Sequence, residues 1–235
     1  MSPADQDSPI IELDGVHKTY RQGQVEVHAL RGLDLKVHPG EFMALIGPSG
    51  SGKTTALNII GALDKPSKGR ALIGGRDLAT MSSGELSTLR RDKIGFVFQA
   101  YNLVPVLTAY ENAEMVVRLQ GVPADERKQR VMQLLADVGL KGMEHRRPAE
   151  LSGGQQQRVA IARAIASNPV VTLADEPTAN VDSKTAEMLL TVMETLNKER
   201  GVTFIFSTHD PRVMARARRI VTLVDGQVES DERRE

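Results

Sequence analysis

The residues best placed to do chemistry form one glycine-rich stretch, Gly47-Pro48-Ser49-Gly50-Ser51-Gly52-Lys53-Thr54. An apolar run, residues 42–46, precedes it, and a helical pattern over residues 55–63 follows. This strand, turn and helix order is what the phosphate-binding pattern GxxxxGK followed by Ser or Thr requires. The glycines let several N–H groups point at one anion, and the helix adds its positive end. Lys53 can reach the outer phosphates of a nucleotide and Thr54 can hold Mg²⁺; a turn that binds nothing is the alternative.

Polar residues also stand just beyond other apolar runs that we interpret as strands: Gln99 after residues 94–98, Asp175 and Glu176 after residues 170–174, and His209 after residues 202–206. Open parallel sheets bind ligands at the carboxyl ends of their strands, so these side chains should meet at one edge. Asp175 would help to hold Mg²⁺, Glu176 would orient or deprotonate an attacking water, and His209 would contact the γ-phosphate. Gln99 would reach both the metal and the water. Each residue alone also has a purely structural interpretation.

A second candidate anion site is Leu151-Ser152-Gly153-Gly154-Gln155, which precedes a strong helical pattern over residues 156–167. Two glycines at the start of a helix expose N–H groups at its positive end, with the Ser152 hydroxyl beside them. The alternative is an ordinary serine cap. One chain therefore carries two candidate phosphate sites about a hundred residues apart in sequence.

The elements that must position these residues indicate an α/β fold. Residues 10–20, 25–30 and 33–37 are predicted strands, hairpin-linked and antiparallel, and the rest alternates strand and helix, which predicts a mainly parallel sheet covered by helices. Ser82 and Glu85 have the spacing of a capping box and should open a helix to about residue 91. Residues 108–138 are helical with a break at 121–123, and a helix fits 183–200. We expect a helical subdomain inserted at about residues 100–168, of which 100–149 contain no strand.

Composition bounds the remaining possibilities. The chain has 235 residues, 40% of them hydrophobic, with 30 basic and 30 acidic side chains. A net charge of zero and only 3% aromatic residues argue against a nucleic-acid partner. The absence of cysteine excludes disulfides and thiolate sites, and no apolar run reaches the length of a membrane span. Residues 1–9 are expected to be a disordered arm, residues 10–229 the folded domain, and residues 230–235 a charged, fraying tail.

Taken together, the motifs resemble those of the ATP-binding-cassette (ABC) family over roughly residues 10–229. The matching features are the glycine-rich loop, Gln99, the LSGGQ signature at residues 151–155, Asp175-Glu176, Asp182 and His209. Val181 departs mildly from the leucine usual before that aspartate. The resemblance implies a P-loop NTPase core with an N-terminal antiparallel β-subdomain, which binds ATP and Mg²⁺ and hydrolyses ATP.

The same resemblance assigns further contacts to the nucleotide. Tyr20 occupies the place of an aromatic that stacks on adenine, and Thr55 follows the metal-binding Thr54. Two copies are expected to pack head to tail around two ATP molecules. Ser152 and Gly154, with the neighbouring Gly153 and Gln155, would then face the γ-phosphate that Lys53 of the other copy holds.

Within the family, the chain is similar to the lipoprotein-releasing and macrolide-export branch (LolD and MacB types) at residues 25–30, 57–61, 94–99 and 102–103, and at Thr108, Glu111 and Asn112. This branch implies a separate integral membrane permease, which would place the chain peripherally on the cytoplasmic side of the inner membrane. Residues 101–107 would border the groove that receives a short permease helix, or would be a loop buried under the helical subdomain. Residues 113–117 differ from the pattern expected there, so the substrates of this branch are not inferred for this chain.

Other interpretations stay open. A periplasmic adaptor protein, acting indirectly through the permease, is one further partner that the sequence leaves open. One alternative is a cassette ATPase that moves no solute and acts mechanically on a membrane partner, as FtsE does. A less favoured one is a soluble cassette protein of translation or DNA repair. A single phosphate loop and a short interval between loop and signature count against the soluble types.

Overall fold

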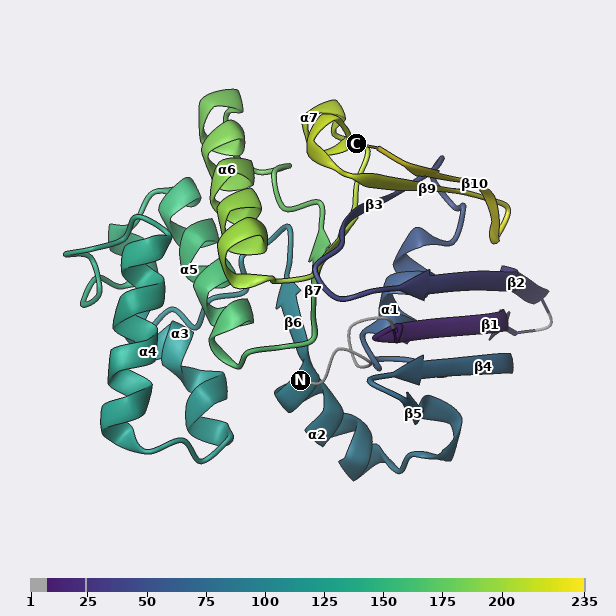
Figure 1. The fold of residues 1–235 in the computed structure, drawn as a ribbon, viewed down its shortest axis with the longest axis horizontal. Coiled ribbons are helices and arrows are strands. Elements are labelled where there is room, and N and C mark those ends of the chain that lie inside the picture. Colours follow the sequence, from purple (N-terminus) through teal and green to yellow (C-terminus); the bar gives the residue numbers. More distant parts are fainter. Residues whose placement is uncertain (1–7, 24, 235) are drawn as a thin grey trace.

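The computed structural model describes residues 8–23 and 25–234. A six-stranded sheet forms its centre, in the spatial order β10 (Gln227–Arg233), β9 (Arg219–Val224), β3 (Phe42–Ile46), β8 (Phe204–Ser207), β7 (Val171–Asp175) and β6 (Ile94–Val97). The strands from β9 to β6 are parallel, and β10 pairs antiparallel with β9. The prediction of a mainly parallel sheet is therefore confirmed (Figure 1).

A smaller antiparallel sheet lies beside the first, in the order β2 (Val25–Val37), β1 (Ile11–Gln22), β4 (Lys68–Ile73) and β5 (Arg76–Asp77). The prediction of two strands within 25–37 is wrong, because β2 runs through the whole segment. Its pairing with β1 shifts register between the pairs Val16–Leu33 and His17–Arg31. Gly32 lies in that shift with a φ of 93°, so a bulge rather than a turn interrupts the alternation.

The helices are α1 (Lys53–Ile60), α2 (Ser83–Lys93), α3 (Ala109–Leu119), α4 (Ala124–Asp137), α5 (Gly153–Ala166), α6 (Ser183–Arg200) and α7 (Pro211–Arg216), with 3₁₀ turns η2 (Leu78–Thr80) and η3 (Pro148–Glu150). The capping box of Ser82 and Glu85 forms as predicted and opens α2. The break between α3 and α4 is also confirmed. Helices α3, α4 and α5 form a layer on one side of β6 and β7, away from the antiparallel sheet (Figure 1).

The chain between β6 and β7 contains helices and 3₁₀ turns but no strand, within the described residues. The boundaries at residues 100 and 168 stay an interpretation of this helical segment. Of the arm predicted at residues 1–9, residues 1–7 lie outside the described residues.

The fraying tail predicted from residue 230 is contradicted, because β10 continues to Arg233. Ser230 donates a hydrogen bond to Thr222, and Asp231 accepts two from Arg219 at 2.8 and 2.7 Å. Charges that suggested a solvated tail are thus used in pairing with β9.

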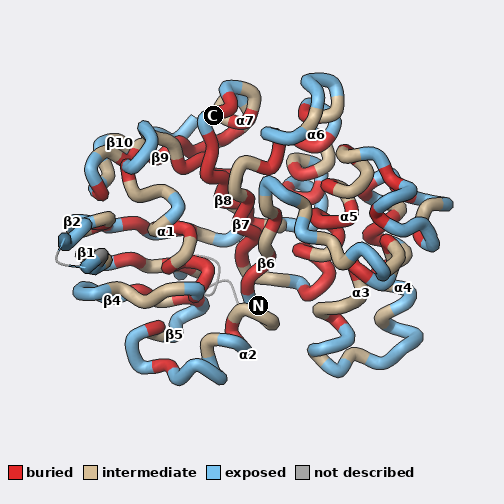
Figure 2. Tube along the Cα trace, turned by 180° about the vertical axis from the view of Figure 1, so that it is seen from behind, coloured by how far each residue is buried: buried red, intermediate tan, exposed pale blue. Residues whose placement is uncertain are grey.

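The core has two main parts, one on each face of the central sheet. One packs α1 and the antiparallel sheet against Met43 and Leu45. The other packs α3–α6 around Phe42, Phe204 and Phe206, whose ring centroids lie 4.7–5.7 Å apart. The inner strands are buried through the middle of the molecule (Figure 2). Such burial fixes the strand ends, where the candidate site lies.

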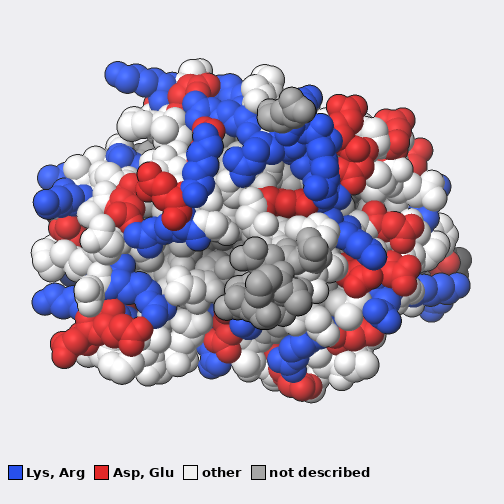
Figure 3. Space-filling model, in the orientation of Figure 1, with Lys and Arg blue, Asp and Glu red and all other residues white. Residues whose placement is uncertain are grey.

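Basic and acidic side chains are mixed over most of the face shown in Figure 3, and Lys and Arg gather near the C-terminal end of the chain. Arginines of that region are ion-paired: Arg212 with Asp210, Arg216 with Glu187 and Glu194, and Arg219 with Glu41 and Asp231. Among the described residues, no helix combines the length and the apolar character needed to cross a membrane.

Candidate nucleotide-binding and catalytic site

The glycine-rich loop between β3 and α1 is held in one shape by its surroundings. Gly47 has a φ of 145°, and a Cβ there would lie 2.1 Å from the Leu223 carbonyl oxygen. A Cβ on Gly52 would lie 2.6 Å from the Ala29 oxygen. Both positions therefore require glycine. No side chain caps α1 at Gly52 among the described residues, so its first N–H groups suit an anion.

Lys53 arches back over this loop. Its ammonium donates hydrogen bonds to the carbonyl oxygens of Gly47 and Pro48, at 2.7 and 2.9 Å. Ser49 and Gly50 at the loop tip are exposed, whereas Ser51 is buried. The loop thus presents exposed backbone and one lysine charge at its mouth, and both fit a polyphosphate.

Thr54 and Asp175 line one small cavity of about 30 Å³, although they come from α1 and from the end of β7. The Asp175 carboxylate makes no hydrogen bond or ion pair within the described residues. The described residues also hold no cluster of three or more carboxylate or imidazole groups. One carboxylate and one hydroxyl fit Mg²⁺, which takes its other ligands from phosphate and water.

Glu176 and His209 are brought together as the sequence predicts. His209 Nδ1 lies 2.6 Å from Glu176 Oε1, and the His209 backbone N–H donates to the same oxygen at 3.2 Å. The Thr208 hydroxyl donates to Oε2 at 3.0 Å. The Glu176 side chain is 19% exposed and that of His209 83%, so the imidazole faces outward from a partly enclosed carboxylate.

Gln99 lies at the end of β6, next to β7, but its side chain turns toward another loop. Its amide donates to the side-chain oxygen of Asn180 at 3.5 Å, and the Asn180 amide donates to the Gln99 carbonyl at 3.0 Å. No hydrogen bond joins Gln99 to Asp175 or Thr54 within the described residues. The assignment of Gln99 to the metal and the water stays a prediction.

The signature segment forms the start of α5. Ser152 caps the helix in a full capping box: its N–H donates to Gln155 Oε1 at 2.9 Å, and its hydroxyl accepts from the Gln155 N–H at 3.3 Å. The serine is therefore a helix cap, and this does not decide whether it also contacts an anion. A Cβ on Gly153 would lie 2.8 Å from the Tyr101 hydroxyl, and one on Gly154 would lie 2.2 Å from Thr185. These glycines therefore let two neighbouring segments approach α5 closely.

Asp182 caps α6 beside the signature. Its carboxylate accepts hydrogen bonds from the backbone and hydroxyl of Thr185, at 3.0 and 2.6 Å, and these bonds hold its pKa below the ordinary value. The same Thr185 contacts Gly154. In contrast, no hydrogen bond within the described residues joins 151–155 to the glycine-rich loop, and β6 and β7 lie between α1 and α5 (Figure 1).

Tyr20, the predicted adenine platform, is anchored through its hydroxyl. It donates to Asp64 at 2.9 Å, and Asp64 also accepts from Lys18 at 2.5 Å. The Lys18 ammonium lies 5.0 Å from the centroid of the tyrosine ring. Burial, followed by the bond to Asp64, raises the pKa of Tyr20. Thr55 lies in the first turn of α1, half-buried.

Sequence reasoning missed several residues that join the loops of the site. The buried Gln157 donates from α5 to the carbonyls of Pro177 and Phe98, at 2.8 and 3.4 Å, and so ties α5 to the segments after β7 and β6. Its signal was a glutamine within the apolar helical pattern. Asn180 and Thr208 had none beyond their proximity to named residues.

Comparisons with known proteins match this arrangement. A family model described as ABC transporter matches residues 30–179. An uncharacterized ABC transporter ATP-binding protein of Thermotoga maritima is 51% identical over 225 residues, which are 96% of each chain. The macrolide export ATP-binding/permease protein MacB of Syntrophobacter fumaroxidans is 49% identical over 94% of this chain and 31% of its own length. The chain thus spans about a third of such MacB relatives.

Solved structures are similar over almost the whole chain. The dimeric post-hydrolysis state of the ATP-binding cassette MJ0796 of Methanocaldococcus jannaschii, bound to ADP and Pi, has a TM-score of 0.86 and 44% identity. That match covers 96% of this chain and 99% of that one. The cbiO1 protein of Clostridium perfringens, part of the cbiONQ transporter complex, has a TM-score of 0.87 at 29% identity and covers 97% and 89%.

Proposed function

This chain belongs to the ABC transporter family and is an ATP-binding cassette ATPase, and we propose that it works as a dimer that drives a membrane permease. One observation carries the catalytic part of this proposal. The glycine-rich loop, His209, the Asp175–Glu176 pair and Gln99 follow β3, β8, β7 and β6, which are successive neighbours in one sheet. Their carboxyl ends form a single edge, as phosphoryl transfer to water requires.

The chemistry at this edge is assigned to the residues as follows. The loop amides and Lys53 would bind the phosphates, and Thr54 with Asp175 would hold Mg²⁺, which would supply positive charge to the phosphates. Glu176 is the general base for the attacking water, because its carboxylate is fixed by hydrogen bonds from Thr208 and His209 yet stays partly accessible.

The pairing of His209 with Glu176 constrains how the imidazole can meet a phosphate. An ionised carboxylate can only accept hydrogen bonds, so Nδ1 carries the proton in this pairing. In the neutral ring Nε2 is then an acceptor, which repels a phosphate oxygen. His209 therefore either carries both protons or turns away from Glu176 when it contacts the γ-phosphate.

Two candidate phosphate sites on one chain support a shared site. The signature at the start of α5 has no hydrogen bond to the loop at residues 47–54 of its own chain, within the described residues. A second copy related by two-fold symmetry would supply the missing partner to both loops at once. The similar MJ0796 structure is described as a dimer bound to ADP and Pi. Ser152 and Gly154 of one copy would face the nucleotide on Lys53 of the other.

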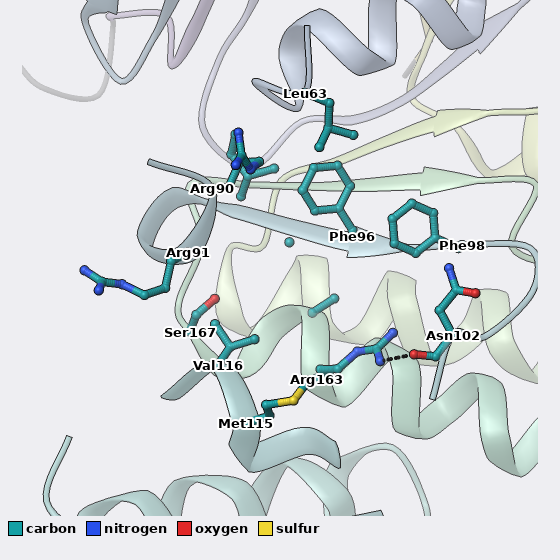
Figure 4. Close-up of a pocket in the computed structure, with 13 residues that line it drawn as sticks. Leu63, Arg90, Arg91, Phe96, Phe98, Asn102, Met115, Val116, Arg163 and Ser167 are labelled. Carbon is teal, nitrogen blue, oxygen red and sulfur yellow. Dashed lines mark hydrogen bonds between the residues drawn. The ribbon is translucent and has the colours of Figure 1, made fainter. Parts of the chain in front are cut away.

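A groove next to the site suits the permease. It has a volume of about 390 Å³ and lies between α2, β6, α3 and α5. Leu63, Phe96, Phe98 and the α3 residues Met115 and Val116 give it apolar walls (Figure 4). Arg90, Arg91 and Arg163 also line it. An amphipathic helix with acidic residues would complement such a surface. Asn102, from the loop predicted to border a permease groove, is part of the lining.

Leu63→Asp should prevent capture of the permease. Leu63 is 52% exposed, so an aspartate there replaces apolar contact surface of the groove by a strongly hydrated carboxylate with little cost to folding. We expect the wild-type chain to co-purify with a membrane permease from solubilised membranes, and the variant to lose at least about ninety per cent of it. Mass spectrometry of the captured proteins makes the measurement.

Val25→Asp is the matched control, because Val25 is 63% exposed on β2, away from the groove. Equal permease capture by Leu63→Asp and Val25→Asp, with both variants folded by circular dichroism, would move the permease contact elsewhere.

The macrolide-export relatives favour the LolD or MacB branch, with the chain on the cytoplasmic side of the inner membrane. Their name joins the ATP-binding part to a permease. Whether the system exports a solute, releases lipoproteins or only transmits force, as in the FtsE-like alternative, is decided by the permease that the capture experiment identifies.

A further inference from the structure

Glu176 has an unusual backbone for the residue assigned as the base. Its φ is 44°, in the left-handed region that residues other than glycine seldom adopt. Its N–H donates to the Ser207 carbonyl at 2.9 Å, and its own carbonyl accepts from Ala179 at 3.2 Å. A strained conformation at a functional site persists only when surrounding contacts over-determine it.

Besides these backbone bonds, the Glu176 side chain is held by a ring of hydrogen bonds through buried residues. The Thr208 hydroxyl donates to Glu176 Oε2 and accepts from the Asp210 N–H, both at 3.0 Å. Asp210 Oδ2 accepts from the Thr178 hydroxyl at 2.7 Å. Thr178 lies two residues beyond Glu176, so the ring joins the loop after β7 to the loop after β8.

Burial and charge leave this ring only one pattern of hydrogen-bond donors and acceptors. Thr208, Thr178 and Asp210 are 0%, 1% and 9% exposed. Arg212 donates to both Asp210 oxygens from its side chain, at 2.7–3.1 Å, and from its backbone at 2.9 Å. Those bonds, chiefly the one from the Arg212 side chain, hold the pKa of Asp210 at about 2. Asp210 is therefore an acceptor only, and each hydroxyl has one direction in which to donate.

We propose that Thr178, Asp210 and Thr208 are positioning residues that fix the Glu176 carboxylate against His209 and the attacking water. They are at least nine-tenths buried and reach the site only through the Glu176 carboxylate, so they act on kcat and leave ATP affinity to the glycine-rich loop. This inference rests on the proposed role of Glu176 as the base.

Thr178→Val tests the ring, because valine keeps the shape of threonine and removes only the hydroxyl that reaches Asp210. A displacement of about 1 Å at a reacting group can cost about 100-fold in rate. We expect kcat to fall at least about tenfold while KM and the Kd for ATP change less than about twofold. Thr178→Ser, which keeps the hydroxyl, should restore most of kcat.

Thr203→Val is the control for the loss of any buried threonine hydroxyl. Thr203 is 2% exposed, just before β8 at the opposite edge of the sheet, and its hydroxyl accepts from the Gly40 N–H at 2.9 Å. It should lower the melting temperature much as Thr178→Val does and leave kcat unchanged. If Thr178→Val does not fold, Thr178→Ser and Thr178→Ala make the same comparison, since they too differ only in the hydroxyl.

Two results overturn the inference. One is a kcat of Thr178→Val equal to that of the wild type, or a kcat of Thr178→Ala equal to that of Thr178→Ser. The other is a fall in kcat matched by Thr203→Val. Glu176→Gln measured in parallel separates this failure from that of the base. If Glu176→Gln retains hydrolysis, Glu176 is not the base. If Glu176→Gln loses hydrolysis while Thr178→Val keeps the wild-type kcat, only the positioning role of the ring is rejected.

Discussion

Glu176→Gln is expected to bind ATP with wild-type affinity and to lose hydrolysis by about a hundredfold to ten-thousandfold, the usual worth of a general base. A glutamine amide keeps the size of the side chain and can still accept from Thr208 or His209, so the site should keep its shape. It cannot take a proton from water. Since hydrolysis ends the bound state, the variant should accumulate as an ATP-bound dimer. Phosphate release and calorimetry measure the two quantities.

Glu41→Gln is the matched control for this substitution. The Glu41 side chain is 13% exposed and paired with Arg219, at the opposite edge of the same sheet. It tests whether the loss of a half-buried carboxylate alone lowers the rate. Glu176 would not be the base if Glu176→Gln hydrolysed ATP at a rate within about threefold of wild type. The same would follow if Glu41→Gln lowered the hydrolysis rate as much as Glu176→Gln does.

Lys53→Ala is expected to weaken ATP binding at least about a hundredfold, because hydrogen bonds to charged groups contribute about 1.5–3 kcal/mol each. The lysine has two tasks here. It supplies the positive charge at the loop mouth, and its ammonium bonds to Gly47 and Pro48 keep the loop closed. Alanine removes both. Isothermal titration with ATP in the presence of Mg²⁺ gives the affinity directly.

Lys65→Ala is the control for losing a lysine that bonds to backbone carbonyls but lies outside the phosphate-binding loop. The Lys65 ammonium also donates to two backbone carbonyls, those of Ala79 and Met81 at 3.3 and 2.6 Å, in a turn outside the loop. It should leave the Kd for ATP nearly unchanged. Equal Kd values for Lys53→Ala and the wild type would contradict the assignment of residues 47–54 as the phosphate site.

Much of the site was predictable because its signals are local. The glycine-rich loop needs glycine at Gly47 and Gly52 for close backbone approach, and this requirement is visible in the sequence. The strand ends carrying Glu176 and His209 were found from apolar runs. The rule on parallel sheets and the family resemblance predict that those ends meet, whereas the order of the strands, which makes them neighbours, is known only from the structure.

What the sequence did not predict depends on long-range contacts. Gln99 was placed by its position after a strand, but its side chain bonds to Asn180, 81 residues away. The tail was misassigned because the charges of residues 231–233 suggest solvent, whereas Arg219 pairs with Asp231 across β9 and β10. The ring through Thr178 and Asp210 joins residues 32 apart, and no pattern in one sequence indicates such a bond.

The central claim is that each ATP site is built from two copies of the chain, and Ser152→Arg in the Glu176→Gln background tests it most directly. Arginine would fill the space where Ser152 faces the nucleotide of the partner copy. Ser82→Arg is the control, because Ser82 caps α2 in the same kind of capping box. Sedimentation velocity in saturating ATP, with bound nucleotide counted in each species, is the measurement.

We expect Glu176→Gln alone, and Glu176→Gln with Ser82→Arg, to form dimers that hold two ATP molecules. Glu176→Gln with Ser152→Arg should stay monomeric with one ATP bound to each chain, since the loop at residues 47–54 is untouched. An ATP-dependent dimer of unchanged stability and nucleotide content in the Ser152→Arg variant would contradict the shared site.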